Sequence, residues 1–91
     1  MAWSFYAGHL GVGQSTRWRF WWGGNAYQGI QVTQARALPR REGEIGFIFP
    51  AELVMSEPSL TLELNGGYSY AVTVTNRGPW DAEYEIVGDS V

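Results

Sequence analysis

The chemistry that this sequence offers most clearly is the stacking of aromatic rings beside planar polar groups. Five tryptophans occur among 91 residues, and several stand next to turns or on outward strand positions. A ring of this kind can stack on the face of a sugar, while amide and carboxylate side chains exchange hydrogen bonds with its hydroxyls. These residue types predict a lectin-like carbohydrate site, with no catalytic group, formed by Trp21, Trp80, Tyr27, Asn25, Gln28, Asn76 and Asp81.

The alternation around Trp21 leaves a second interpretation open. In the segment 16–22, Trp18, Phe20 and Trp22 point to one face of a strand, while Arg17, Arg19 and Trp21 point to the other. The first row is the core of a small sandwich, since each tryptophan can bury roughly 150–250 Å². Trp21 is either a stacking platform or a ring covered by a partner. The alternative function is therefore a self-assembling structural module, a homo-oligomer that buries surplus aromatics between protomers.

Catalytic and metal chemistry have little support in the sequence. His9 is the only histidine and there is no cysteine, so we expect no metal site, no cofactor and no enzyme. Asp81, Glu83 and Glu85 could approach a Ca²⁺ ion, but one strand presents too few converging oxygens. Arg17 and Arg19 match Glu83 and Glu85 in spacing. If their strands are neighbours, or meet across a dimer, they would form a charged ladder.

The composition of the chain argues against nucleic acid and membranes as partners. The net charge is -3 and all six basic residues are arginine, which argues against nucleic acid. No apolar stretch is long enough to span a bilayer and no signal peptide is visible, so we expect no membrane partner. The expected protein is cytoplasmic, or a mature domain cut from a longer chain. At this length, residues 1–91 form one domain.

Alternating apolar residues on both sides of Asn65-Gly66-Gly67 predict a β-hairpin with one buried face. About seven strands follow from alternation and turn residues, at 2–7, 15–22, 27–34, 44–49, 58–64, 68–76 and 82–88. The fold class expected is all-β, an immunoglobulin-like sandwich of two antiparallel sheets. One helical turn is possible at 50–55. The expected core comprises Tyr70, Val72, Val74, Leu62, Leu64, Trp18, Phe20, Ile30, Val32, Tyr84 and Ile86, with Leu60 on the same face.

The hairpin Leu64–Val74 resembles the E-to-F strand region of fibronectin type III and related immunoglobulin-like modules. In that region a leucine, a Pro-Gly turn, a tyrosine and alternating valines recur in this order, and Asn65-Gly66-Gly67 stands here in place of the Pro-Gly turn. The resemblance implies a sandwich fold and makes Tyr70 the corner tyrosine, with its hydroxyl bonded to nearby backbone. It implies no particular ligand, because such sandwiches carry many functions.

Overall fold

The protein is built of strands. The computed structural model describes residues 1–22, 29–39, 41–42, 47–64 and 66–90. Its elements are β1 (Ala2–Leu10), β2 (Ser15–Trp22), β3 (Gln31–Ala37), β4 (Arg41–Glu42), β5 (Phe47–Ile48), β6 (Ala51–Leu62), β7 (Tyr68–Pro79) and β8 (Ala82–Asp89).

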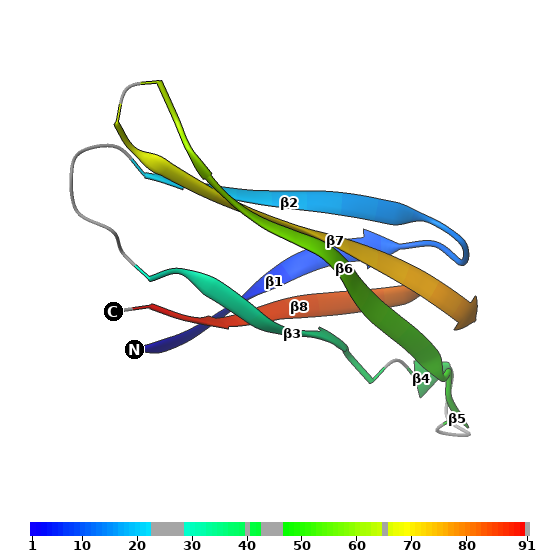
Figure 1. The fold of residues 1–91 in the computed structure, drawn as a ribbon. Coiled ribbons are helices and arrows are strands. Elements are labelled where there is room, and N and C mark those ends of the chain that lie inside the picture. The colour runs from blue at the N-terminus through cyan, green and yellow to red at the C-terminus, as the bar shows by residue number, and fades with distance from the viewer. Residues whose placement is uncertain (23–28, 40, 43–46, 65, 91) are drawn as a thin grey trace.

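Two antiparallel three-stranded sheets form two layers, in the orders β1-β8-β3 and β2-β7-β6 (Figure 1). The short strands β4 and β5 form a separate pair. The first strand thus lies beside the last one, and each sheet has a C-terminal strand, β7 or β8, at its centre. The predicted all-β fold of two antiparallel sheets is confirmed. The helical turn predicted at 50–55 is wrong, because Ala51–Met55 begins the long strand β6, which pairs with β7.

The core lies where the inner rows of the two central strands meet. Val72 and Val74 of β7 form one buried cluster with Tyr84 and Ile86 of β8. These side chains alternate with outward residues, as the period of a strand requires. Leu10 and Val32 complete the buried cluster, and the predicted core residues Trp18, Phe20 and Tyr70 pack against it partly buried. Ile30 is also partly buried.

Aromatic rings fill the side of the sandwich formed by β1 and β2. The ring of Phe5 lies 5.3 Å from that of Trp18 and 6.0 Å from that of Phe20, both edge to face. The indole nitrogen of Trp18 donates a 2.8 Å hydrogen bond to the hydroxyl of Tyr84. Trp18 is therefore explained by packing between the sheets.

Trp3 explains why β8 needs a glycine near its end. A Cβ atom on Gly88 would lie 2.3 Å from the Trp3 ring, far inside van der Waals contact. The indole of Trp3 therefore occupies the space that a side chain at position 88 would fill, and the glycine permits this close approach.

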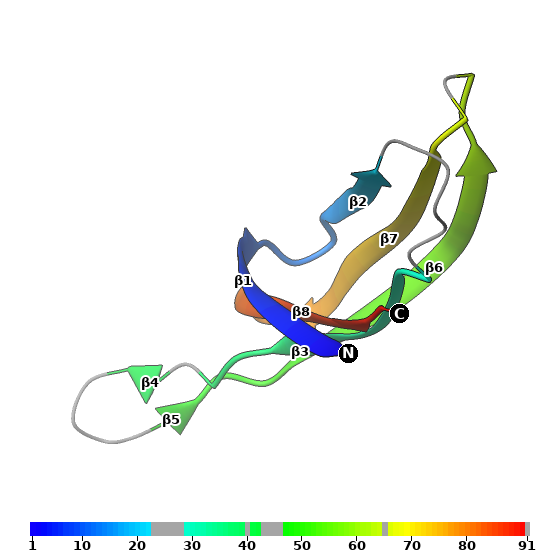
Figure 2. The same cartoon turned by 90° about the vertical axis from the view of Figure 1, so that its left-hand side faces the viewer.

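The β6–β7 hairpin extends beyond the other layer. Leu60 and Leu62 pair with Tyr70 and Tyr68, so they point inward as predicted. Leu60 is nevertheless 48% exposed and Leu62 64% exposed. Figures 1 and 2 show the hairpin end rising past the β1-β8-β3 layer. The prediction that Leu60, Leu62 and Leu64 are buried is wrong, because alternation sets the direction of a side chain and not whether anything covers it.

The condition for a charged ladder within one protomer, that the two strands are neighbours, is not met. Arg17 and Arg19 lie on β2, whereas Glu83 and Glu85 lie on β8 in the other sheet. Glu85 instead pairs with Arg36 of β3, and Glu83 accepts a hydrogen bond from the hydroxyl of Tyr6. Each glutamate thus finds its partner on a neighbouring strand of its own sheet.

Two alanine substitutions test the difference in burial between Ile86 and Leu62. Ile86→Ala should lower the free energy of unfolding by about 2–5 kcal/mol, because it leaves a cavity in a fully buried cluster. Leu62→Ala should change it by no more than about 1 kcal/mol, since most of the side chain is already in water. Urea denaturation of both variants measures this. Equal losses would contradict the exposed position of Leu62.

Candidate functional site

The outer face of the β2-β7-β6 sheet carries large side chains on one edge and small ones elsewhere. Trp21 of β2 lies in register with Ser69 of β7, which pairs in turn with Thr61 of β6. The next outward row consists of Arg19, Ala71 and Ser59. Strand partners on one face lie side by side. The large β2 side chains, Trp21 and Arg19, therefore lie beside small residues of β7 and β6.

Two adjoining hollows lie on this outer face, each with a volume of about 270 Å³. They share Arg19 and Glu63, and Trp21 borders the first one with its side chain 60% exposed. Leu64 completes the first hollow, and the second is also lined by Arg17, Ser59, Thr61, Ser69 and Ala71. The exposed indole therefore stands directly beside guanidinium, carboxylate and hydroxyl groups.

Glu63 is held in place at the centre of this surface. The Ser69 hydroxyl donates a 2.6 Å hydrogen bond to its carboxylate, and Arg19 forms an ion pair with the same oxygen. The hydrogen bond from Ser69, and next that from Arg19, lower the pKa of Glu63 below its ordinary value. The carboxylate is thus ionised at neutral pH and accepts hydrogen bonds. This network covers Ser69, which the alternation places on the outer face and which is nonetheless buried.

Arg17 crosses the same face and fastens an irregular part of β6. Its guanidinium donates hydrogen bonds to the hydroxyl of Thr73 at 2.9 Å, the hydroxyl of Ser59 at 3.0 Å and the carbonyl of Glu57 at 3.0 Å. The register of β6 shifts between Ser56 and Ser59, and Glu57 has a positive φ of 53°. Arg17 therefore joins all three strands of the sheet across this bulge.

Of the other predicted site residues, Trp80, Asp81 and Asn76 lie at or next to the opposite end of β7. Trp21 is in register with the start of β7, and Trp80 follows its last residue. Ser69, the partner of Trp21, lies eleven residues before Trp80, which corresponds to about 36 Å along the strand at a rise of about 3.3 Å per residue. The ring of Trp80 meets Phe49 edge to face, and Asp81 accepts a 3.0 Å hydrogen bond from the backbone of Val12. The structure does not join Trp21, Trp80 and Asp81 into one site.

Asn76 is corrected from a ligand-binding residue to a structural one. Its side chain is completely buried. The amide nitrogen donates to the carbonyls of Leu10 and Trp80, both at 2.9 Å, and the amide oxygen accepts a 2.7 Å hydrogen bond from the backbone of Gly78. All its polar atoms are used to fix the turn between β7 and β8. Asn25, Tyr27 and Gln28 lie outside the described residues.

Sequence reasoning missed the polar groups beside Trp21. Arg19 was placed on the Trp21 face, but Glu63, Ser59, Thr61 and Ser69 were not counted with it. Alternation within the hairpin does place them on the face opposite to the leucines. The missing information was the pairing of β2 with β7, which brings segments far apart in sequence together.

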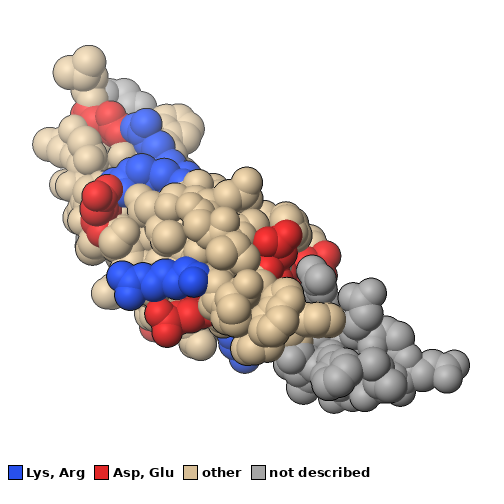
Figure 3. Space-filling model, turned by 90° about the vertical axis from the view of Figure 1, so that its right-hand side faces the viewer, with Lys and Arg blue, Asp and Glu red and all other residues tan. Residues whose placement is uncertain are grey.

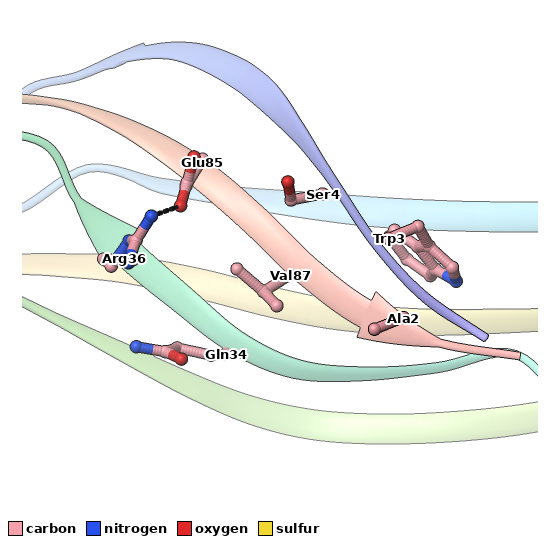
Figure 4. A pocket seen from close by; sticks show the side chains of 7 residues that line it. All are labelled: Ala2, Trp3, Ser4, Gln34, Arg36, Glu85 and Val87. Atoms are coloured by element: carbon pink, nitrogen blue, oxygen red, sulfur yellow. Dashed lines mark ion pairs between the residues drawn. The ribbon is translucent and has the colours of Figure 1, made fainter.

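The outer face of the other sheet has a hollow of about 380 Å³ (Figure 4). Val87 lies near its middle, Ser4 and Gln34 stand on either side, and the Arg36–Glu85 ion pair closes one end. Its lining residues are Ala2, Trp3, Ser4, Gln34, Arg36, Glu85 and Val87. Trp3 is partly buried and packs on Gly88, so this hollow lacks a ring as exposed as that of Trp21.

Charges on the described surface occur mostly in pairs of opposite sign. Arginines and acidic side chains lie next to one another in the face shown in Figure 3. No group of three or more His, Asp or Glu side chains able to hold a metal ion is found in the described part of the chain. Within that same part, no helix has the length and apolar character needed to cross a membrane.

No protein-family model, curated protein or solved structure matches this chain. The resemblance of Leu64–Val74 to fibronectin type III modules stays a prediction, as does the role of Tyr70 as a corner tyrosine. Candidate functions therefore depend on the geometry of the surface itself.

The lowered pKa of Glu63 predicts how stability responds to acid. A carboxylate with a lowered pKa stabilises the fold above its unfolded pKa, near 4.5, and this contribution disappears as pH falls through the folded pKa. Glu63→Gln should therefore be less stable than the wild type at pH 7, and the gap should narrow below pH 4.5. Urea denaturation at pH 7 and at about pH 3 measures the gap. An unchanged gap would mean that Glu63 is not held by these contacts.

Proposed function

We propose that this protein is a non-catalytic binding module that recognises a carbohydrate on the outer face of the β2-β7-β6 sheet. The observation that carries the proposal is the exposed Trp21 ring beside the Arg19–Glu63 pair. The indole would stack on a sugar ring, while Arg19 donates hydrogen bonds and Glu63 accepts them.

The shape of the surface supports this class of ligand. Both hollows are shallow and lie just below the usual range of about 300–1,000 Å³ for enclosed small-molecule sites. A sugar can bind such an open surface through one face of its ring and through hydroxyls that point sideways. The hydroxyls of Ser59 and Thr61 line the second hollow and add donors and acceptors next to the ion pair.

The position of the only histidine supports a role without catalysis. His9 lies 3.4 Å from the carboxylate of Asp81. That pair belongs to the end of β7 opposite to Trp21. The Trp21 surface thus has no histidine as general base, although its serine and threonine hydroxyls would otherwise be candidate nucleophiles.

The alternative function, a self-assembling module that buries Trp21 between protomers, has less support. The indole lies over polar groups that already pair with each other, whereas a buried interface core is depleted of charge. The exposed apolar residues next to the core lie on the other face of the hairpin.

A pair of tryptophan variants tests the proposal. A glycan array identifies a ligand for the wild type, and calorimetric titration with that ligand compares Trp21→Ala with Trp80→Ala. Loss of the Trp21 ring should weaken binding at least about tenfold, since a stacking aromatic at the centre of a site contributes roughly 1–2 kcal/mol or more. Trp80→Ala is the matched control, because it removes an equally bulky exposed ring at the other end.

The control should bind like the wild type. The reverse result, with binding lost in Trp80→Ala and kept in Trp21→Ala, would move the site to the Trp80 end. A wild-type protein that binds no glycan would contradict the carbohydrate proposal itself.

A further inference from the structure

The surface beside Trp21 presents more positive than negative charge to a ligand. Arg17 and Arg19 lie two residues apart on the outer row of β2, and both line the second hollow. Among the described residues, Glu63 supplies the only carboxylate of this lining. Its side chain is 26% exposed, whereas the side chain of Arg19 in the same ion pair is 61% exposed. A ligand therefore meets the guanidinium side of the pair first.

The charge of Arg17 has no carboxylate at hydrogen-bond distance. Its three hydrogen bonds go to neutral oxygens, those of the Thr73 and Ser59 hydroxyls and of the Glu57 carbonyl. Within the described part of the chain, the carboxylate nearest to it is that of Glu57, at 3.9 Å, which is too far for a hydrogen bond. Three of the five N–H groups of Arg17 are thus used, which leaves two for a further acceptor.

We propose that the ligand of this surface is an acidic oligosaccharide, one whose sugar rings carry carboxylates as uronic acids do. The inference rests on the proposed function and specifies its class of ligand. Trp21, Arg19 and Arg17 follow one another at about 6–7 Å along the outer row, because alternate residues of a strand share a face. The row thus offers a stacking ring and then two cations to successive units of an extended ligand.

The geometry of arginine favours a carboxylate as the acidic group. A planar guanidinium can donate two parallel N–H···O bonds to a carboxylate, and such charge-assisted bonds are roughly twice as strong as neutral ones. The hydroxyls of Ser59 and Thr61 lie in the same lining and can bind the uncharged hydroxyls of the ligand.

The remaining charges argue against a nucleic acid as the anionic ligand. The chain has a net charge of -3 and contains no lysine. The ionised carboxylate of Glu63 lies between the tryptophan and the hydroxyl groups, where it would repel the phosphates of a nucleic acid strand. In an acidic sugar chain, by contrast, neutral hydroxyls can donate hydrogen bonds to this carboxylate.

An array of matched glycans tests the charge preference. It holds oligosaccharides of glucose, galactose and mannose beside those of the corresponding uronic acids, so that the members of each pair differ in their carboxylates. Within the pairs that bind, the wild type should bind the acidic member at least about tenfold more tightly. Raising NaCl from about 0.01 M to about 1 M should remove most of this preference, since the Debye length falls from about 30 Å to about 3 Å.

Arg17→Gln and Arg77→Gln form a matched pair of variants for the same array. Both remove one positive charge from the β2-β7-β6 sheet, and each arginine lies 3.9 Å from a carboxylate in the wild type. Arg77 lies near the far end of β7 and lines neither hollow. Arg17→Gln should weaken the binding of acidic glycans about tenfold and that of neutral ones by no more than about twofold. Arg77→Gln should bind both like the wild type.

The possible outcomes separate this inference from the proposed function. Neutral glycans bound as tightly as their acidic partners would overturn the acidic class and leave the carbohydrate proposal standing. Equal loss of acidic and neutral binding in Arg17→Gln would also overturn it, because Arg17 would then act only by holding the sheet together. Single-stranded DNA bound more tightly than any acidic glycan would overturn it in favour of nucleic acid. A wild type that binds no glycan would contradict the proposed function and this inference with it.

The wild-type measurements decide the matter if Arg17→Gln fails to fold. The preference for acidic glycans and its loss at high salt are both measured on the unaltered chain. A preference that salt does not change would overturn the inference, because contacts between exposed charges are screened by salt.

Discussion

Packing between the inner rows of the two central strands is the interaction on which the remaining structure depends. Val72 and Val74 of β7 and Tyr84 and Ile86 of β8 are all buried in one cluster. The strands differ in length, however, with twelve residues in β7 and eight in β8. The cluster can cover only the part of β7 that faces β8 and its neighbours. The hairpin end extends beyond this cluster, and the molecule measures 53 Å in its longest dimension.

The hairpin end of β6 and β7 has two faces of different chemistry. Leu60 and Leu62 point to the inner side, while Thr61 and Glu63 point to the outer side, as the two-residue period of a strand requires. On the outer face, Arg19 and Ser69 hold Glu63 beside the exposed Trp21. One short segment therefore carries a polar outer face and an apolar inner face.

Local periodicity predicted much of this fold. The two sheets, the hairpin and the outward position of Trp21 all follow from alternation within single strands. The predictions that were wrong concern residues whose surroundings depend on contacts between segments far apart in the sequence. Exposure of Leu62 depends on where the other sheet ends, and burial of Asn76 depends on carbonyls of Leu10 and Trp80. The site at Trp21 likewise needs Glu63, which the pairing of β2, β7 and β6 brings close.

Amide hydrogen exchange along β7 tests the central claim, that the core packing between β7 and β8 does not extend to the hairpin end. In dilute protein, the amides of Val72 and Val74 should be protected to the level of global unfolding, and those of Tyr68 and Tyr70 should exchange much faster. Uniform protection along β7 would contradict the account.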